Sequence, residues 1–206
     1  MAPAARGDQL VLASRSPQRR AILETIGVEF VVRPSAFAEA ERGVPEQVAL
    51  GNALGKALAV ARAYGEVVLG VDTVVALGGA IHGKPRDAAA ARATLRALSG
   101  ATHVVISGLA LVGLDDAPRL ATSVTEVTFR SLDGPTIDWY LASGEWRERA
   151  GGYAIQRAGC ALVESISGDW TNVVGLPVGA LLDLHPALLA ARNNRLKAPD
   201  SGQLQH

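Results

Sequence analysis

The chain has 206 residues, of which 49% are hydrophobic and 19% charged, and its formal net charge is zero. This length and apolar content suit one domain or two small lobes with a real core, and they exclude a disordered chain. Without net positive charge, bulk nucleic-acid binding and general attraction to acidic membranes are disfavoured. An anionic substrate must therefore be held by a local cluster of Lys and Arg.

The single cysteine, Cys160, excludes an intrachain disulfide and argues against a cysteine-based metal site. Residues 1–9 lack the apolar core of a signal peptide, and no stretch approaches the roughly 18 uninterrupted apolar residues of a membrane span. We therefore expect a soluble protein of a reducing compartment, the cytoplasm, with no nucleic-acid or membrane partner.

The first half of the chain alternates strands and helices. Short apolar or β-branched runs predict the strands, and segments that open with Pro predict the helices. Gly27 stops the first helix, and Gly78-Gly79 is a hairpin turn signal. We expect, in order, a strand at 9–13, a helix at 17–26, a strand at 28–32, a loop at 35–44, a helix at 45–64, a central strand at 67–77 and a short strand after the turn.

The second half adds a long hairpin to this alternation. Asp87 is a helix N-cap signal, and Asp115-Asp116 marks the hairpin turn. We expect a helix from Asp87 to about Ser99-Gly100, paired strands at 103–114 and 120–129, a helix at 134–142, a strand at 160–166 and a helix at 177–189. The pattern predicts an α/β (α+β) fold in two lobes, with one domain over 1–190 and a fraying polar tail over 191–206.

The turn from Ser14 to Arg20 is the first candidate site. It leads from a strand into a helix, whose first backbone N–H groups and partial positive charge attract anions. Ser14 and Ser16 add hydroxyl donors, and Arg19 adds a planar fork for phosphate oxygens. The competing interpretation is a Ser N-cap followed by basic residues on a solvated helix face.

Asp72 lies inside an otherwise apolar strand, and a carboxylate is costly to bury there unless a divalent cation or a Lys compensates it. A phosphoryl-transfer site needs that arrangement. The alternative is an Asp that caps a turn at a strand end, but the apolar run resumes after Thr73. Nearby, Gly83-Lys84-Pro85 offers a stiffened Lys, which either neutralises phosphate or is simply solvated.

Two glycine-containing segments later in the chain complete the motifs. Gly151-Gly152 precedes an aromatic residue, and the amide of Gln156 follows, so this segment either approaches a nucleobase or forms an ordinary loop. Gly168–Pro177 is a turn that feeds a helix, and its Asp and Asn are candidate caps. Gly51–Lys56 is not a P-loop, because its spacing is one residue short and Ala57 replaces the Ser/Thr.

Taken in order, these motifs resemble the Maf family. The matching residues span Leu12 to Pro177 and are Ser-x-Ser-Pro-x-Arg-Arg, a Lys on the following long helix, Val-Asp-Thr, Gly-Lys-Pro, Ser99-Gly100 with His103, Ala-Gly-Gly-Tyr-x-Ile-Gln and Asn-Val-Val-Gly-Leu-Pro. The resemblance implies a Maf/inosine triphosphatase-like fold, a mixed central sheet flanked by helices, with two lobes around a positively lined cleft. It also implies hydrolysis of nucleoside triphosphates at the α–β bond to a monophosphate and pyrophosphate.

The resemblance also implies roles for single residues. Asp72 matches the proton acceptor, and Glu39 falls where the family has an acidic residue near a divalent metal, which is Mg, Mn or Co. The usual Asp before it is Ala38 here. The phosphate-binding set is Ser14, Ser16, Arg19, Lys56 and Lys84. A homodimer is compatible with the resemblance.

Three positions sort the base in subfamilies of this type, and here they are Gln18, Thr73 and Gln156. Thr73 and Gln156 are similar to the branch that prefers dTTP and UTP, whereas Gln18 stands where that branch usually has Arg, and Arg157 replaces its usual Gly. The resemblance therefore favours dTTP, UTP or modified pyrimidine nucleotides over 7-methyl-GTP, in a housecleaning or cell-division-arrest role. The alternative function is a non-catalytic nucleotide-binding regulator of septum formation, which keeps the cleft without turnover.

Overall fold

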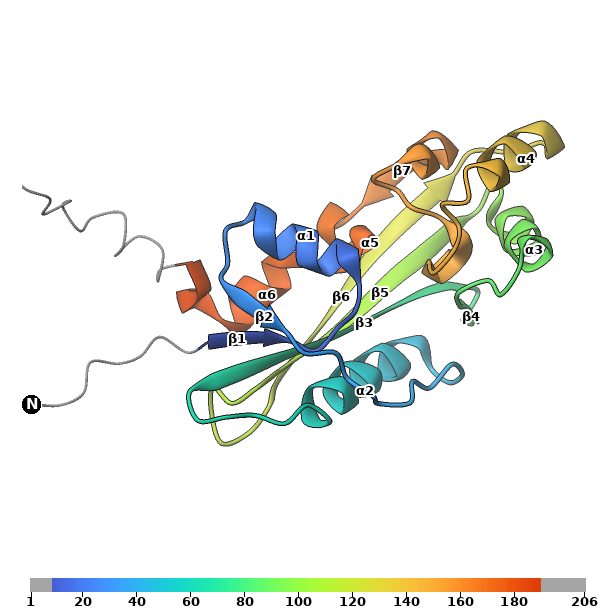
Figure 1. The fold of residues 1–206 in the computed structure, drawn as a ribbon. Helices are drawn as coiled ribbons and strands as arrows, with labels where there is room; N and C mark the ends of the chain where they lie inside the picture. The colour runs from blue at the N-terminus through green and yellow to red at the C-terminus, as the bar shows by residue number, and fades with distance from the viewer. Residues whose placement is uncertain (1–8, 190–206) are drawn as a thin grey trace, which may run out of the picture.

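The computed structural model describes residues 9–189, and the predicted tail at 191–206 lies outside the described residues. A seven-stranded mixed sheet in the order β2-β1-β3-β5-β6-β7, with β4 paired to β3, forms its centre (Figure 1). The strands are β1 (Gln9–Leu12), β2 (Phe30–Val32), β3 (Glu66–Leu77), β4 (Ala80–His82), β5 (Thr102–Val112), β6 (Arg119–Phe129) and β7 (Val163–Ser167). Strand β1 runs parallel to β2 and β3, and the other pairs are antiparallel.

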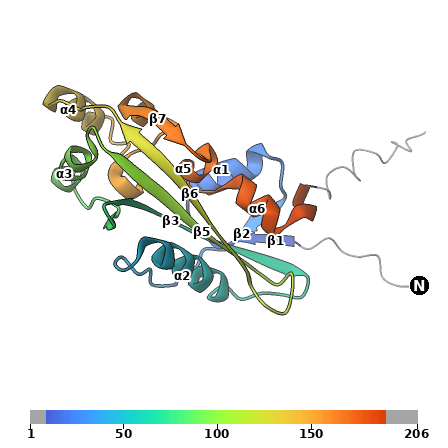
Figure 2. The same ribbon diagram turned by 180° about the vertical axis from the view of Figure 1, so that it is seen from behind.

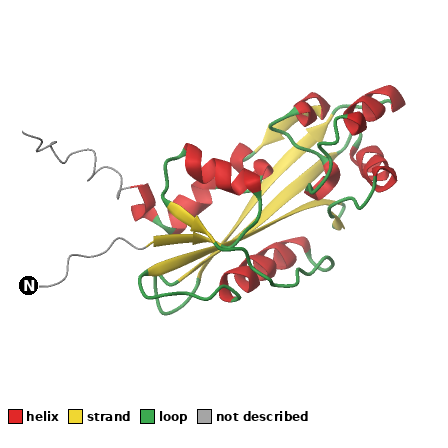
Figure 3. Ribbon diagram, viewed as in Figure 1, coloured by secondary structure: helices red, strands yellow, loops and turns green. Residues whose placement is uncertain are grey.

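Helices pack on both faces of this sheet (Figures 2 and 3). The α-helices are α1 (Pro17–Thr25), α2 (Pro45–Leu58), α3 (Ala88–Leu98), α4 (Gly134–Ala142), α5 (Trp170–Val174) and α6 (Val178–Leu184). The short 3₁₀ helices are η1 (Ala150–Gly152), η2 (Ala158–Leu162) and η3 (Pro186–Leu189). Within residues 9–189, no helix is both long and apolar enough to cross a membrane.

The apolar core follows from the alternation of side chains along β3 and β5, because successive residues of a strand point to opposite faces. On one face, Leu69 and Val71 pack with α1 and α6, and further along Val75 packs with α3 and α4. On the other face, Val68 and Val74 pack against the small side chains of α2. Helix α2 thus lies alone under the centre of the sheet in Figure 1.

The predicted α/β fold with a mixed central sheet is confirmed, including the long β5–β6 hairpin and the Asp87 cap, whose carboxylate accepts from Ala90 N–H. The helix predicted over 45–64 ends at Leu58 instead. Two side chains form hydrogen bonds with backbone groups that a longer helix would use for its own hydrogen bonds. Arg33 donates to the Ala61 carbonyl, and Glu66 accepts from Ala63 N–H.

Two other boundaries differ from prediction. The strand expected at 160–166 begins only at Val163, because Gly159 packs so close to the Ala154 backbone that a Cβ there would lie 2.5 Å from the Ala154 carbonyl oxygen. The chain is coiled into η2 at that contact. The helix expected at 177–189 is broken at His185, since the residue before Pro186 is disfavoured in the helical conformation.

Two strand glycines allow α2 to lie directly on the sheet. A Cβ on Gly70 would lie 2.0 Å from the Ala53 carbonyl oxygen, and one on Gly108 would lie 2.4 Å from the Ala49 carbonyl oxygen. Both neighbours are helix backbone, so no side chain can move aside. The glycines therefore fix the distance at which α2 approaches β3 and β5.

We expect Gly70→Ala to reduce the free energy of unfolding by about 1–3 kcal/mol, because the new methyl group overpacks the helix–sheet contact. Gly51→Ala, on an open part of the same helix with no atom within 4 Å of the new Cβ, should instead stabilise by about 0.5–1 kcal/mol. Urea unfolding of both variants measures the difference. If Gly70→Ala and Gly51→Ala had the same free energy of unfolding, α2 would not be closely packed on β3 at Gly70.

Candidate active site

The candidate site lies where one edge of β3 has no strand neighbour. Strand β1 pairs with β3 up to Leu69, and β4 pairs with it from Val75 onward. Among the described residues no strand pairs with that edge between these two positions, and Asp72 stands in the middle of the interval. Side chains from both faces of the sheet therefore reach the same opening.

A pocket of about 1000 Å³ surrounds this interval. It is bordered by the start of α1, the loop at 35–42, the α2 side chains Asn52 and Lys56, the β4–α3 loop and the segment at 148–156. Every residue that the sequence singled out for the site lines it, namely Ser14, Ser16, Gln18, Arg19, Glu39, Lys56, Asp72, Thr73, Lys84 and Gln156. The fold thus brings together residues that are far apart in the chain.

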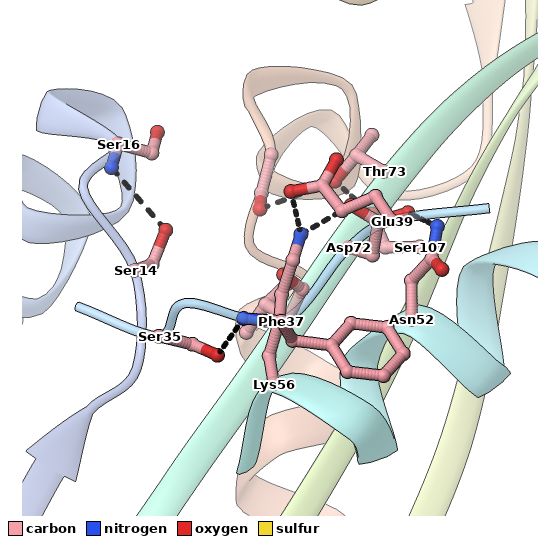
Figure 4. Close-up of polar contacts among 12 residues, drawn as sticks. Ser14, Ser16, Ser35, Phe37, Glu39, Asn52, Lys56, Asp72, Thr73 and Ser107 are labelled. Atoms are coloured by element: carbon pink, nitrogen blue, oxygen red, sulfur yellow. Dashed lines mark hydrogen bonds and ion pairs between the residues drawn. The ribbon is translucent and has the colours of Figure 1, made fainter. Parts of the chain in front are cut away.

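The carboxylate of Asp72 is only 6% exposed and is held by two side chains of α2 (Figure 4). Lys56 Nζ lies 2.6 Å from Asp72 Oδ1, and Asn52 Nδ2 donates to Asp72 Oδ2 at 2.9 Å. The buried charge is thereby compensated by an ammonium group and a neutral donor, as burial in an apolar strand requires. A carboxylate has about four lone-pair sites, so further acceptor capacity remains.

A second carboxylate converges on the same ammonium group. Glu39 Oε1 lies 2.7 Å from Lys56 Nζ, and the Glu39 side chain is 41% exposed while that of Lys56 is 8% exposed. The Lys56 ammonium group is thus shared by two carboxylates. Figure 4 shows Lys56 rising from α2 between the two acidic groups.

The donor set fits a divalent metal of the kind that substrate phosphates help to bind. Among residues 9–189 no group of three or more His, Cys, Asp or Glu side chains could hold a metal alone. Mg²⁺ in phosphate-transfer sites, however, is usually held by one or two carboxylates together with phosphate oxygens and water. Asp72 and Glu39 supply those two carboxylates.

Arg19 is buried and joins three parts of the chain. Its Nε donates to the Gly175 carbonyl at 2.9 Å, Nη1 to Ser14 Oγ at 2.9 Å and Nη2 to Thr73 Oγ1 at 3.2 Å. Burial lowers the pKa of Arg19, and the negative charges of Asp72 and Glu39 oppose that shift. Three of the five N–H groups of the Arg19 guanidinium thus bind other parts of the protein, and its charge interacts with both carboxylates.

The start of α1 has free backbone donors. Ser16 is the N-cap residue, but its side chain makes no capping bond; its hydroxyl donates instead to Gln18 Oε1 at 3.1 Å. The first N–H groups of α1 are thus left without a side-chain cap, which favours the anion-site interpretation of this turn over the plain N-cap. Ser14 Oγ also accepts from Ser16 N–H at 3.2 Å.

Lys84 and Gln156 lie on the far side of the pocket and are both exposed. Their loops are linked, since Gly151 N–H donates to the Gly83 carbonyl at 3.2 Å. Gly151 has a φ of 67° and packs on Val75, so only glycine suits this position.

His103 holds the segment at 148–156 in place through Tyr153. Its Nε2 is hydrogen-bonded to the Tyr153 hydroxyl at 2.9 Å, and its ring packs edge-on against Tyr153 and Phe129. Burial, with a smaller contribution from the charge of His82, lowers the pKa of His103 from 6.5 to about 4. The imidazole is thus neutral in the folded protein at pH 7.

This pKa predicts a loss of stability in mild acid. Between pH 6.5 and about 4 the unfolded chain binds a proton at His103 that the folded chain does not, so the free energy of unfolding falls as the pH falls. We expect a loss of about 2 kcal/mol from pH 7 to pH 5. Urea unfolding at both pH values measures it.

The control for this prediction is His103→Gln, which should show a much smaller difference between pH 7 and pH 5. Glu66 contributes little to this difference, because hydrogen bonds from Arg33 lower its pKa from 4.5 to about 2 and most of its effect on stability falls below pH 5. An unchanged pH dependence in His103→Gln would contradict the assignment.

Two residues of the site were not foreseen from the sequence. Asn52 is 3% exposed and binds Asp72, and Ser107 is fully buried with its Oγ 2.8 Å from Thr73 Oγ1. Asn52 carried a usable signal, since it lies four residues before Lys56 and so on the same face of the helix. Ser107 depends on the β3–β5 register, which the sequence pattern does not fix.

The fold and the site define an α/β protein whose pocket combines paired carboxylates, buried cations and a helix start suited to phosphate groups. The family model described as "Maf-like protein" matches residues 9–187, and the chain belongs to the Maf family.

Curated relatives support this assignment. A dTTP/UTP pyrophosphatase of Gloeobacter violaceus is 48% identical over 179 residues, covering 85% of this chain and 94% of the relative. One of Pyrococcus furiosus is 40% identical over 179 residues, covering 85% and 93%. Among solved structures, a HAM1 protein from Coxiella burnetii matches with a TM-score of 0.43 and 19% identity, covering 75% of this chain and 90% of that one.

Proposed function

We propose that this chain hydrolyses nucleoside triphosphates at the α–β bond, releasing a nucleoside monophosphate and pyrophosphate. The observation that carries the proposal is the convergence of Asp72, Glu39 and Lys56 at a pocket that also receives the start of α1. Relatives that are at least 40% identical and named dTTP/UTP pyrophosphatase point to the same reaction.

In this proposal Asp72 orients a water molecule and accepts its proton. The water oxygen bonds to the α-phosphorus, the α–β anhydride bond breaks, and the electron pair leaves with pyrophosphate. The pocket around Asp72 is partly closed to solvent, and charges placed beforehand in such a site stabilise developing charge strongly. Lys56 and Lys84 are the cations that face the phosphates, and Ser14, Ser16 and the α1 N–H groups donate to their oxygens.

Asp72 and Glu39 are the residues that would hold a divalent metal, whether Mg, Mn or Co. When bound, such an ion polarises phosphate oxygens and neutralises charge on the leaving group. Because Lys56 Nζ contacts both carboxylates, its ammonium group keeps them close together.

Base selection is assigned to Gln18, Thr73 and Gln156, with dTTP and UTP as the preferred substrates. The Thr73 hydroxyl is engaged by Arg19 and Ser107, so Thr73 acts on base selection indirectly. Gln156 is exposed at the pocket wall and offers an amide to a base edge. The cytoplasm is the proposed location, consistent with the exposed, unpaired Cys160.

One product assay tests the function. The protein is incubated with Mg²⁺ or Mn²⁺ and a panel of canonical and modified nucleoside triphosphates, and pyrophosphate and orthophosphate are measured separately. We expect pyrophosphate and monophosphate in equal amounts, fastest from dTTP and UTP. Orthophosphate as the first product, or no turnover of any nucleotide, would reject the proposal; binding without turnover would favour the septum-formation regulator.

A further inference from the structure

The loop that delivers Glu39 to the site has no regular structure of its own. Residues 33–44, named the Glu39 loop, contain neither helix nor strand and connect β2 to α2. A carboxylate on such a loop is positioned well only if the loop is held by neighbouring elements. In this chain it is held on both sides of Glu39 by one face of α2.

The first anchor is Asn52. Its Oδ1 accepts from Ala40 N–H at 2.8 Å, and its Nδ2 donates to the Ala40 carbonyl at 2.9 Å. The same Nδ2 donates to Asp72 Oδ2 at 2.9 Å. Asn52 thus binds both Ala40, the residue after Glu39, and the carboxylate of Asp72. It therefore helps to fix the position of Glu39 relative to Asp72.

The second anchor is the ring of Phe37, which packs on the bare backbone of Gly55. A Cβ built on Gly55 would lie 2.3, 2.4 and 2.7 Å from three atoms of that ring, well inside contact distance. Phe37 is 39% exposed, so its ring lies on the helix surface and is not enclosed by the core. Gly51, one turn earlier, faces open space.

These anchors lie on the helix face that also carries Lys56. Positions 52, 55 and 56 are spaced i, i+3 and i+4, so their side chains share one side of α2. Phe37 and Ala40 bracket Glu39, and Glu39 Oε1 reaches Lys56 Nζ at 2.7 Å. Figure 4 shows Phe37, Asn52 and Lys56 arranged along the helix beneath Glu39.

We infer that Asn52 and Gly55 are positioning residues for the metal-binding pair Glu39 and Asp72. The inference rests on the proposed function in taking those two carboxylates as the metal ligands. Neither residue would touch the ion; each holds the loop that carries Glu39 beside Lys56 and Asp72. Residues that support metal ligands in this way typically contribute about 10–100-fold to metal affinity or activity.

The test compares Asn52→Leu and Gly55→Ala with Gly51→Ala, a matched alanine substitution on the same helix. Mn²⁺ is titrated into each protein, with and without α,β-methylene-dTTP, and free Mn²⁺ is followed by electron paramagnetic resonance. We expect both anchor variants to bind Mn²⁺ about 10–100-fold more weakly than wild type, and Gly51→Ala to match wild type. At saturating Mn²⁺ the turnover of Gly55→Ala should return toward the wild-type value.

Circular dichroism establishes which variants fold. If Asn52→Leu does not fold, Gly55→Ala alone tests the inference, because the methyl group that it adds displaces only the exposed ring of Phe37. Mn²⁺ affinity of Gly55→Ala equal to that of Gly51→Ala would overturn the inference, as would a wild-type protein that binds no Mn²⁺ in either condition. The proposed function fails separately: weaker Mn²⁺ binding in the variants, without hydrolysis of any nucleotide by wild type, would reject the function and keep the positioning role.

Discussion

Asp72→Asn is expected to abolish pyrophosphate release while the chain stays folded. The substitution keeps the shape of the side chain but removes the charge that pairs with Lys56 and the proton acceptor of the proposed reaction. A loss of at least about 10²–10⁴-fold in turnover follows, which is the typical contribution of a general acid or base. The measurement is pyrophosphate release from dTTP with Mg²⁺.

The structural cost of this change should be modest. Lys56 keeps Glu39 as a partner, so its buried ammonium group is not left uncompensated. The amide of the new Asn presents one NH₂ group, so Asn52 Nδ2 or Lys56 Nζ loses its acceptor, at a cost of about 1–3 kcal/mol.

Asp116→Asn, in the exposed β5–β6 turn, is the control for removing a carboxylate charge and should leave turnover unchanged. Circular dichroism and urea unfolding of both variants separate lost chemistry from lost structure. Near-normal turnover by folded Asp72→Asn would remove Asp72 from the catalytic role.

The position of Asp72 was predictable because an ionisable group inside an apolar strand is costly without a partner. That reasoning named a metal or a Lys as the compensation, and Lys56 lies 2.6 Å away. The contribution of Asn52 was not predictable in the same way. It depends on how closely α2 approaches β3, and Gly70 and Gly108 set that distance through contacts with the helix backbone.

The sheet was easier to predict than the ends of its helices. Strands β3, β5 and β6 are long apolar or alternating runs, and their pattern alone indicates them. Helix α2, in contrast, stops where Arg33 and Glu66, which form a salt bridge at 2.9 Å, capture backbone groups of the following loop. Contacts between residues so far apart in sequence override local helix propensity.

The two arginines that end the Ser14–Arg20 turn differ in a way that only the structure reveals. Both lie on the first turns of α1, and phosphate binding was predicted for Arg19 from its planar guanidinium group and from the family resemblance. In the structure the Arg19 guanidinium is buried and binds Ser14, Thr73 and the Gly175 carbonyl. The Arg20 side chain is 63% exposed and pairs with Glu24, four residues later.

Arg19→Met is therefore expected to lower the free energy of unfolding by at least about 3 kcal/mol, since three acceptors, two of them on the buried residues Ser14 and Gly175, lose a charged donor at once. Arg20→Met should change it by no more than about 0.5 kcal/mol, because an exposed i, i+4 ion pair contributes little. Urea unfolding of the two variants at pH 7 measures the contrast.

Arg19→Lys separates the structural role of Arg19 from direct phosphate binding. Lys keeps the charge but lacks the planar fork with which Arg19 reaches Ser14, Thr73 and Gly175 in different directions, so it should recover part of the substrate affinity and little of the stability. If Arg19→Met were as stable as Arg20→Met and only its KM for dTTP rose, Arg19 would be a phosphate ligand and nothing more. If both stability and KM change, as we expect, the same guanidinium that joins α1 to β3 and to the α5–α6 turn also keeps its two remaining N–H groups close to the phosphates.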